Sequence, residues 1–345
     1  MKRYKIILVF LIALLFISSI YITILYYQGG AGEESLLVRV NPGDSFSDVK
    51  SRLERRGVLK HPEVFRWAAY LMGKEGSLRV GEYRFRKQES VASVLEKLTG
   101  GRVEYRKIVI PEGLLLTEIA SIAAEKTGID STRFVELSSS GTVIDSLGFQ
   151  STTLEGYLFP DTYLVTWPFS TRSLILQMVE RFRDVYSREA KEAADSVGLS
   201  RHEAVTLASI IQAEARVVEE MPRISAVYHN RLERGMKLEA DPTVAYALGG
   251  VRRRLWYKDL RVDSPYNTYK YRGLPPGPIC SPGREALCAA VHPEPDFAAL
   301  YFVADGTGGH IFSETIREHN RARRIIRRGD IPENNATEDK IENSR

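Results

Sequence analysis

The sequence predicts an α+β protein in three parts: a single N-terminal transmembrane helix, a small α+β subdomain and a larger mixed α/β domain. Three observations lead to this prediction. Residues 6–27 form an uncharged apolar run of 22 residues. Over 36–102, short strand-like segments alternate with helical patterns, and over 103–328 the helical patterns are longer and the strands fewer. A chain of 345 residues is long enough for two domains of ordinary size.

The apolar run is long enough to span a bilayer as a helix. Basic residues precede it within 1–5, and Glu33 and Glu34 follow it. This asymmetry predicts a cytoplasmic stub at 1–5, a transmembrane helix at 6–27 and an extracytoplasmic location for the rest. A cleaved signal peptide is the alternative, but its apolar region is normally about 7–15 residues and precedes a small-residue cleavage site. We therefore expect an uncleaved anchor.

The composition excludes disorder throughout, because 43% of the residues are hydrophobic and 27% charged. The 48 basic and 44 acidic residues leave a net charge of +4, so no nucleic acid is expected as a partner. Two cysteines are too few for a disulfide framework or a zinc site. Cys280 and Cys288 either pair in an oxidising compartment or remain two separate buried thiols.

The first domain is predicted over 36–102. A strand pattern, a Pro-Gly-Asp turn and helical spacing follow one another, and a second strand and a third helix complete the module. The predicted strands are 36–40 and 81–85, and the predicted helices are 45–57, 62–72 and 90–98.

The second domain is predicted over 103–328, and the polar tail at 329–345 is expected to be disordered. Its predicted helices are 117–126, 131–138, 171–197, 200–218, 221–235 and 314–328, with a hairpin of strands at 299–304 and 310–313. The last helix carries seven basic residues and is interpreted as a solvated face. The segment 250–283, rich in Pro, Gly, Tyr and Asn, is predicted to be a functional loop.

The sequence contains none of the phosphate-loop, zinc-protease, serine-hydrolase or C-x-x-C motifs, and the six histidines lack metal-ligand spacing. No cofactor or metal is therefore expected. The most informative acid is Glu214. It follows Leu207, Ile210 and Ile211 at helical spacing, which places its carboxyl on an apolar stripe. Burial there raises the pKa of a carboxyl group, as a general acid requires. The alternative is a glutamate at the stripe's edge, satisfied by a salt bridge.

Other polar residues lie among aromatic ones. Residues 154–163 (LEGYLFPDTY) place Glu155 and Asp161 among three aromatic rings, which suits either a glycan cleft or a buried strand and turn. The same two kinds of interpretation apply to Asn267, Tyr269, Asp241 and Asn230. Asp241 could simply cap the helix that Pro242 begins, and Asn230 could be a core amide.

Six segments occur in a characteristic order: LEGYLFPDTY, ASIIQAEA, VYHNRL, ADPTVAY, SPYNTYKYRGLPPG followed by SPG, and YFVADGTGGH. Together they closely resemble the endolytic murein transglycosylases, the MltG or YceG-like family, over about residues 36–328. The strand, turn and helix pair of 36–102 likewise resemble a LysM-like carbohydrate-binding module. The resemblance implies a membrane anchor, this LysM-like subdomain and a transglycosylase catalytic domain over 103–328.

The resemblance also implies an activity, that of a carbon–oxygen lyase. Such an enzyme cleaves the β-1,4 bond between N-acetylmuramic acid and N-acetylglucosamine inside glycan strands and leaves 1,6-anhydromuramic ends. The family's catalytic glutamate corresponds to Glu214, and Gln212 stands where some relatives carry a second glutamate. By motif position, the expected substrate-binding residues are Glu155, Asp161, Asn267, Tyr269, Asp241 and Asn230.

The expected location is the bacterial cytoplasmic membrane, with the catalytic domain outside. The expected partners are peptidoglycan strands and a peptidoglycan synthase, and action on nascent strands would limit their length. Two rival interpretations remain. One is a hydrolase in which Glu155 or Asp241 activates water opposite Glu214. The other is a non-catalytic, peptidoglycan-binding membrane scaffold.

Overall fold

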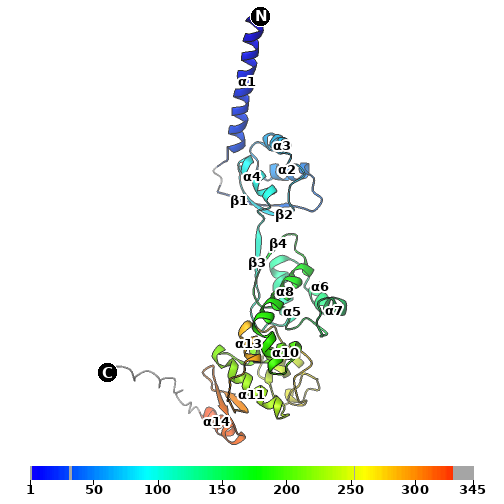
Figure 1. The fold of residues 1–345 in the computed structure, drawn as a ribbon, viewed down its shortest axis with the longest axis vertical. Helices are drawn as coiled ribbons and strands as arrows, with labels where there is room; N and C mark the ends of the chain where they lie inside the picture. Colours follow the sequence, from blue (N-terminus) through cyan, green and yellow to red (C-terminus); the bar gives the residue numbers. More distant parts are fainter. Residues whose placement is uncertain (1, 31–32, 252, 329–345) are drawn as a thin grey trace, which may run out of the picture. The chain divides into compact units, whose positions relative to one another are not determined.

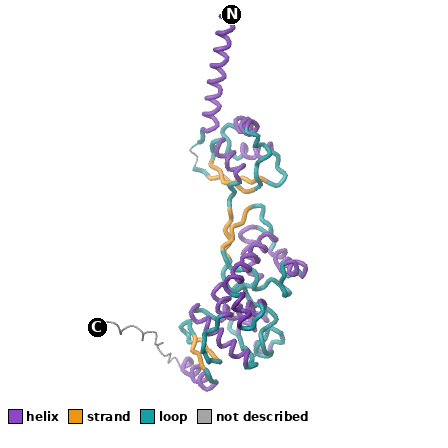
Figure 2. Tube along the Cα trace, viewed as in Figure 1, coloured by secondary structure: helices purple, strands orange, loops and turns teal. Residues whose placement is uncertain are grey.

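A computed structural model describes residues 2–30, 33–251 and 253–328, and it is a mixture of helices and short strands, as predicted (Figures 1 and 2). The predicted tail at 329–345 lies outside the described residues. Two compact units are present. The first contains the residues up to Ile108 together with Tyr163–Ser170, and the second contains Val109–Thr162 and the residues from Thr171 onward.

The N-terminal helix α1 (Lys2–Tyr27) contains a continuous apolar stretch, Tyr4–Tyr27, with a mean hydropathy of 2.8. Its side chains are exposed rather than packed in a core. By length and composition this helix can cross a membrane.

The rest of the first unit is built on a two-stranded antiparallel sheet of β1 (Ser35–Val40) and β2 (Gly81–Arg86). Its helices are α2 (Phe46–Arg55), α3 (Pro62–Leu71) and α4 (Val91–Gly100). Ser45 begins α2 with a capping box, because its hydroxyl accepts from the Asp48 N–H and the Asp48 carboxyl accepts in return.

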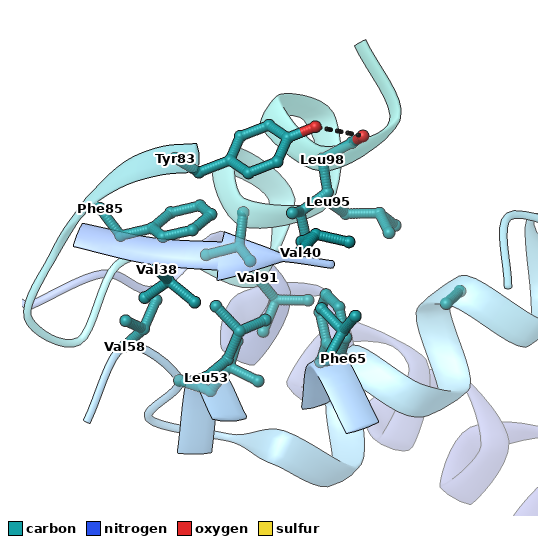
Figure 3. Close-up of a cluster of buried hydrophobic side chains, with 14 residues drawn as sticks. Val38, Val40, Leu53, Val58, Phe65, Tyr83, Phe85, Val91, Leu95 and Leu98 are labelled. Carbon is teal, nitrogen blue, oxygen red and sulfur yellow. Dashed lines mark hydrogen bonds between the residues drawn. The ribbon is translucent and has the colours of Figure 1, made fainter. Parts of the chain in front are cut away.

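The core of this unit lies between the sheet and the helices (Figure 3). Val38 and Val40 of β1 pack with Leu53 of α2 and Phe65 of α3. Tyr83 is fully buried, and its hydroxyl donates to the carbonyl oxygen of Arg79 at 2.7 Å. The predicted strands and helices of this region are therefore confirmed within a few residues at their ends.

A second two-stranded sheet joins β3 (Tyr105–Val109) with β4 (Thr162–Thr166). Strand β4 was not predicted from the sequence. Only Tyr163 and Val165 of its five residues are buried, so its pattern is short and depends on pairing with β3.

The second unit is mainly helical (Figure 1). Its helices are α5 (Leu116–Thr127), α6 (Ser131–Ser138), α7 (Gly141–Ser146), α8 (Thr171–Glu189), α9 (Lys191–Ser196), α10 (Arg201–Glu214), η1 (Val218–Glu220), α11 (Met221–Glu233), α12 (Asp241–Ala247), η2 (Asp259–Arg261), α13 (Arg284–Val291) and α14 (Ile316–Arg328). The predicted hairpin is present as β5 (Tyr301–Ala304) and β6 (His310–Ser313), and α14 packs on it. Helices α7 and α13 were not predicted.

Helix α10 differs from its prediction in two ways. It is buried on every side over residues 204–211, because α9, α11, α12 and α13 all pack against it. It also ends at Glu214 instead of continuing to Val218, since Ala215 adopts an extended conformation (φ −72°, ψ 130°). The predicted capping box at Ser200 and Glu203 is confirmed. The core helix therefore ends on the acidic residue that the spacing singled out.

The predicted helix over 171–197 is two helices, because the backbone leaves helical geometry at Ala190 (φ −131°, ψ −23°). The structure also decides between the alternatives for the cysteines. Cys280 and Cys288 are both free thiols, and Cys280 is buried.

Candidate active site

The second unit contains a cavity of about 1140 Å³. Its wall combines the segment after β3, the end of α10, the start of α12, the segment 250–260 and one face of α14. The predicted functional loop therefore supplies much of the wall. Among the predicted site residues, Glu214, Asp241 and Tyr269 line the cavity.

Glu214 is the last residue of α10 and is only partly exposed. The Tyr228 hydroxyl of α11 donates to Glu214 Oε1 at 3.2 Å. The other carboxyl oxygen, Oε2, has no hydrogen-bond partner among the described residues. One oxygen is thus held by the protein, and the other is free to meet a ligand.

Burial and the negative charge of Asp241 raise the pKa of Glu214 to about 7, although the Tyr228 hydrogen bond acts in the opposite direction. The position of Glu214 adds to the effect, because the C-terminal end of a helix disfavours a carboxylate. Glu214 can therefore carry a proton near neutral pH and release it within the cavity.

Asp241 lies at the N-terminal end of a helix, whereas Glu214 lies at a C-terminal end. It is the first residue of α12, with Ala240 in the capping position, so the N-cap interpretation of Asp241 is wrong. The N-terminal end of a helix favours a negative charge. The Tyr269 hydroxyl also donates to Asp241 Oδ1 at 2.6 Å. Burial and Asp241 together raise the pKa of Tyr269, which keeps this donor protonated.

Asn267 and Thr268 hold this tyrosine in place from the interior. The Asn267 side-chain amide donates to the carbonyl oxygens of Leu260 and Val262, and its Oδ1 accepts from the Tyr269 N–H at 3.0 Å. The Thr268 hydroxyl accepts from the Ala240 N–H at 3.0 Å. Asn267 is fully buried. It therefore orders the loop that presents Tyr269 and does not itself line the cavity.

Three other predicted site residues lie outside the cavity wall. The buried Glu155 carboxyl accepts from the Leu116 N–H at the start of α5, at 3.0 and 3.2 Å. Asp161 forms an ion pair of 2.6 Å with Arg181 near β4. The Asn230 amide donates to the carbonyl oxygens of Phe297 and Ala299 at 2.7 and 3.0 Å. Each of the three joins segments that are distant in the sequence.

Two polar residues of the wall were not predicted. Burial raises the pKa of Glu112, whose carboxyl hydrogen-bonds to Gln212. Gln212 Oε1 also accepts from the Gly283 N–H at 2.9 Å. A Cβ at Gly283 would lie 2.0 Å from the Glu112 carboxyl carbon, so only glycine leaves this carboxyl its place. The IPEG sequence around Glu112 has neither helical nor strand periodicity, which is why the pattern did not reveal it.

The wall also contains two exposed aromatic residues and five arginines. The aromatic residues are Trp256 and Tyr257, and the arginines are Arg216, Arg253, Arg254, Arg323 and Arg327. The last two belong to α14, so one face of this helix lines the cavity and is not merely solvated. Within the described residues, no cluster of His, Cys, Asp and Glu is placed to hold a metal ion.

Comparison with known proteins identifies relatives of this chain. The sequence model of the YceG-like family matches residues 38–325. An endolytic murein transglycosylase of Bacillus subtilis is 34% identical over 302 residues, which cover 83% of each chain. One from Streptococcus pneumoniae is 29% identical over 82% of this chain, which spans 57% of that protein's length. The crystal structure of a putative YceG-like protein from Listeria monocytogenes has a TM-score of 0.59 and 31% identity, and covers 84% of this chain and 99% of that one.

Proposed function

Because the chain belongs to the YceG-like family, we infer that it is a lytic transglycosylase of peptidoglycan, and we propose Glu214 as its catalytic residue. The bond cleaved is the β-1,4 bond between N-acetylmuramic acid and N-acetylglucosamine inside a glycan strand. One observation supports the catalytic role most directly. Glu214 lines the large cavity with a pKa raised to about 7, and one of its carboxyl oxygens has no partner among the described residues.

The first step is proton donation. Protonated Glu214 gives its proton to the glycosidic oxygen, the bond from that oxygen to C1 of muramic acid breaks, and positive charge develops at C1. The leaving sugar departs with a new hydroxyl group. Asp241 lies in the same wall, and its negative charge favours this positively charged state.

The second step closes a ring. The Glu214 carboxylate removes the proton from the C6 hydroxyl of the same muramic acid, and this oxygen bonds to C1. The product is a 1,6-anhydro end, no water is consumed, and Glu214 recovers its proton. The attacking hydroxyl belongs to the sugar itself, which supplies the advantage of an intramolecular reaction.

The wall is suited to hold the sugars. Trp256 and Tyr257 are 61% and 81% exposed, and their rings offer faces on which sugar rings can stack. Tyr269 and Asp241 offer a hydroxyl group and a carboxylate for hydrogen bonds with sugar hydroxyls. Asn267 acts at a distance, by ordering the loop that carries Tyr269. Glu155 holds the start of α5, and Asn230 holds the segment that precedes β5.

The N-terminal apolar helix supports a location of this activity at the membrane. Helix α1 anchors the chain, and the residues that follow it act on the extracytoplasmic side, in the cell wall. The first unit is a LysM-like module that binds glycan strands. A peptidoglycan synthase is the candidate partner, and cleavage of nascent strands beside the membrane would limit their length.

The rival is a hydrolase in which Asp241, rather than the C6 hydroxyl, prepares the attacking group by activating water. The observation that favours this alternative is that Asp241 lines the same wall as Glu214. Mass spectrometry of digested peptidoglycan separates the two. A transglycosylase yields 1,6-anhydromuramic ends that resist borohydride reduction, whereas a hydrolase yields reducible products that are heavier by one water molecule. Reducible products alone would overturn the proposed reaction.

A further inference from the structure

The cavity wall contains arginine side chains that have no role in the proposed cleavage mechanism. Of the residues that the structure describes, five arginines line the cavity, against the three acids Glu112, Glu214 and Asp241. Burial raises the pKa of both Glu112 and Glu214, and that of Glu214 reaches about 7, so Glu214 is only partly ionised near neutral pH. The electrostatic field in the cavity is therefore positive.

Among the described residues, four of these arginines have no acidic partner. Arg253 pairs with Asp259 at 2.7 Å, but in the part of the chain that the structure describes, Arg216, Arg254, Arg323 and Arg327 have no ion pair. Arg323 and Arg327 are spaced i, i+4 on α14, where like charges repel and weaken a helix. Such an arrangement is stabilised when an anion lies between the two guanidinium groups.

The sugar rings of a peptidoglycan strand are N-acetylated and uncharged. Its negative charge is carried by the O3 substituent of muramic acid. This substituent is a lactyl group, which ends in a free carboxylate or, through an amide bond, in a peptide that has carboxylates of its own. Guanidinium groups bind carboxylates in a planar, bidentate geometry.

We propose that Arg216, Arg254, Arg323 and Arg327 form a subsite for the carboxylates on the O3 substituent of muramic acid. The proposal rests on the proposed function, and it adds a substrate preference: the enzyme selects strands by the charge of their side groups as well as by their sugars. Helix α14 is then a recognition element, since it brings two of the four arginines to the wall.

The helix itself provides a matched control. Arg321 and Arg324 are exposed on α14 but do not line the cavity. The charge-reversal pair Arg323→Glu with Arg327→Glu can therefore be compared with Arg321→Glu and Arg324→Glu in the full-length chain. Both variants change the net charge of the helix equally, and only the first changes the wall. A milder pair, Arg323→Gln with Arg327→Gln, covers the case in which charge reversal prevents folding.

Three substrates give the readout: peptide-bearing strands, amidase-treated strands with free lactyl carboxylates, and amidase-treated strands whose carboxylates have been methyl-esterified. For the first two, the wall variant should raise KM about tenfold, equivalent to about 1.4 kcal/mol, with a much smaller effect on kcat. The control pair should stay within about twofold of wild type. Esterification should raise the KM of the wild-type enzyme and reduce its difference from the wall variant.

The increase in KM that the wall variant causes is compared between peptide-bearing and amidase-treated strands. The substrate with the larger increase identifies whether the subsite prefers the peptide carboxylates or the lactyl carboxylate. Equal KM values for the wall and control variants would overturn the proposal, as would undiminished binding of esterified strands by the wild type. Failure of the wild-type enzyme to cleave any of the three strands is a different result, because it would reject the proposed function itself.

Discussion

The Tyr228 hydroxyl donates a 3.2 Å hydrogen bond to Oε1 of Glu214, and this bond joins two core helices at the edge of the cavity. Tyr228 is fully buried within α11, so it has little freedom to move. The bond fixes the orientation of a carboxyl group that its surroundings otherwise keep protonated. It also lowers the pKa of Glu214 slightly against the larger effects of burial and Asp241.

The pH dependence of cleavage follows from this balance. A general acid must be protonated, so kcat/KM should fall as the pH rises through about 7, the raised pKa of Glu214. Asp241→Asn removes a negative charge that raises this pKa, so the falling limb should move to lower pH. The readout is the position of the limb and not its height, because Asp241 also faces the substrate. If the falling limb of Asp241→Asn lay at the same pH as that of the wild type, Glu214 would not be the group whose titration limits cleavage.

Tyr228→Phe should move the same limb the other way. The variant loses the hydrogen bond that lowers the pKa of Glu214, so the limb should shift to higher pH. At pH values below the falling limb, kcat/KM of Tyr228→Phe should be about five- to tenfold lower than that of the wild type, since one hydrogen bond of about 1 kcal/mol no longer orients the acid. A shift in the same direction as that of Asp241→Asn would contradict the assignment of both residues.

Glu155 should be structural. Burial raises the pKa of Glu155 to about 8, so between its ordinary pKa and 8 the folded state holds a proton that the unfolded state has lost. The wild-type protein therefore loses stability as the pH rises through this range. Glu155→Gln keeps an acceptor for the Leu116 N–H and cannot ionise, so its melting temperature should exceed that of the wild type by more at pH 9 than at pH 5.

Glu155→Ala gives the complementary result. It leaves the buried Leu116 N–H without a partner and should cost about 2–4 kcal/mol of stability at pH 5. The cost should be smaller at pH 9, because the wild type is itself destabilised there by its ionised, buried carboxyl group. Cleavage by Glu155→Gln should remain close to that of the wild type. A large loss of kcat with an unchanged melting temperature would instead place Glu155 in contact with the substrate.

Gly156, next to Glu155, permits a close approach to Pro278. Its φ of +81° disfavours other residues, and a Cβ would lie 2.4 Å from Pro278 Cβ. Gly156→Ala should therefore destabilise the protein by about 2–4 kcal/mol. Gly148 has a similar φ of +68° with open space around it, so Gly148→Ala should cost only about 1 kcal/mol. Equal melting temperatures for the two variants would show that the contact with Pro278 is unimportant.

Local patterns predicted much of the fold. The capping boxes at Ser45 and Ser200 depend on residues three positions apart, and both were readable from the sequence. Strand β4 and helix α13 were missed because their stability comes from partners distant in the chain, β3 for one and α10 for the other. The end of α10 was missed because Ala215 is a good helix former that tertiary structure holds in an extended conformation.

The site was predictable only in part, for the same reason. Glu214 was found because an acid on an apolar helix is a local anomaly. Asn267 and Asn230 carry the residue types of a sugar site, but their amides bind backbone carbonyl groups, which no spacing rule reveals. The partners of Asn267 lie in its own loop, and those of Asn230 lie in a distant segment. Glu112 could not be recognised as a wall residue from the sequence, because its position depends on Gln212 and on the absence of a side chain at Gly283.

The most direct test of the central claim compares two Glu→Gln substitutions on one helix. Glu214→Gln keeps the size of the side chain and removes its acid, whereas Glu203→Gln changes a glutamate at the far end of α10 that only caps the helix. Release of anhydromuramic products from purified peptidoglycan should fall by at least about a hundredfold for Glu214→Gln and should be nearly unchanged for Glu203→Gln. Cleavage by Glu214→Gln at the wild-type rate would contradict the account.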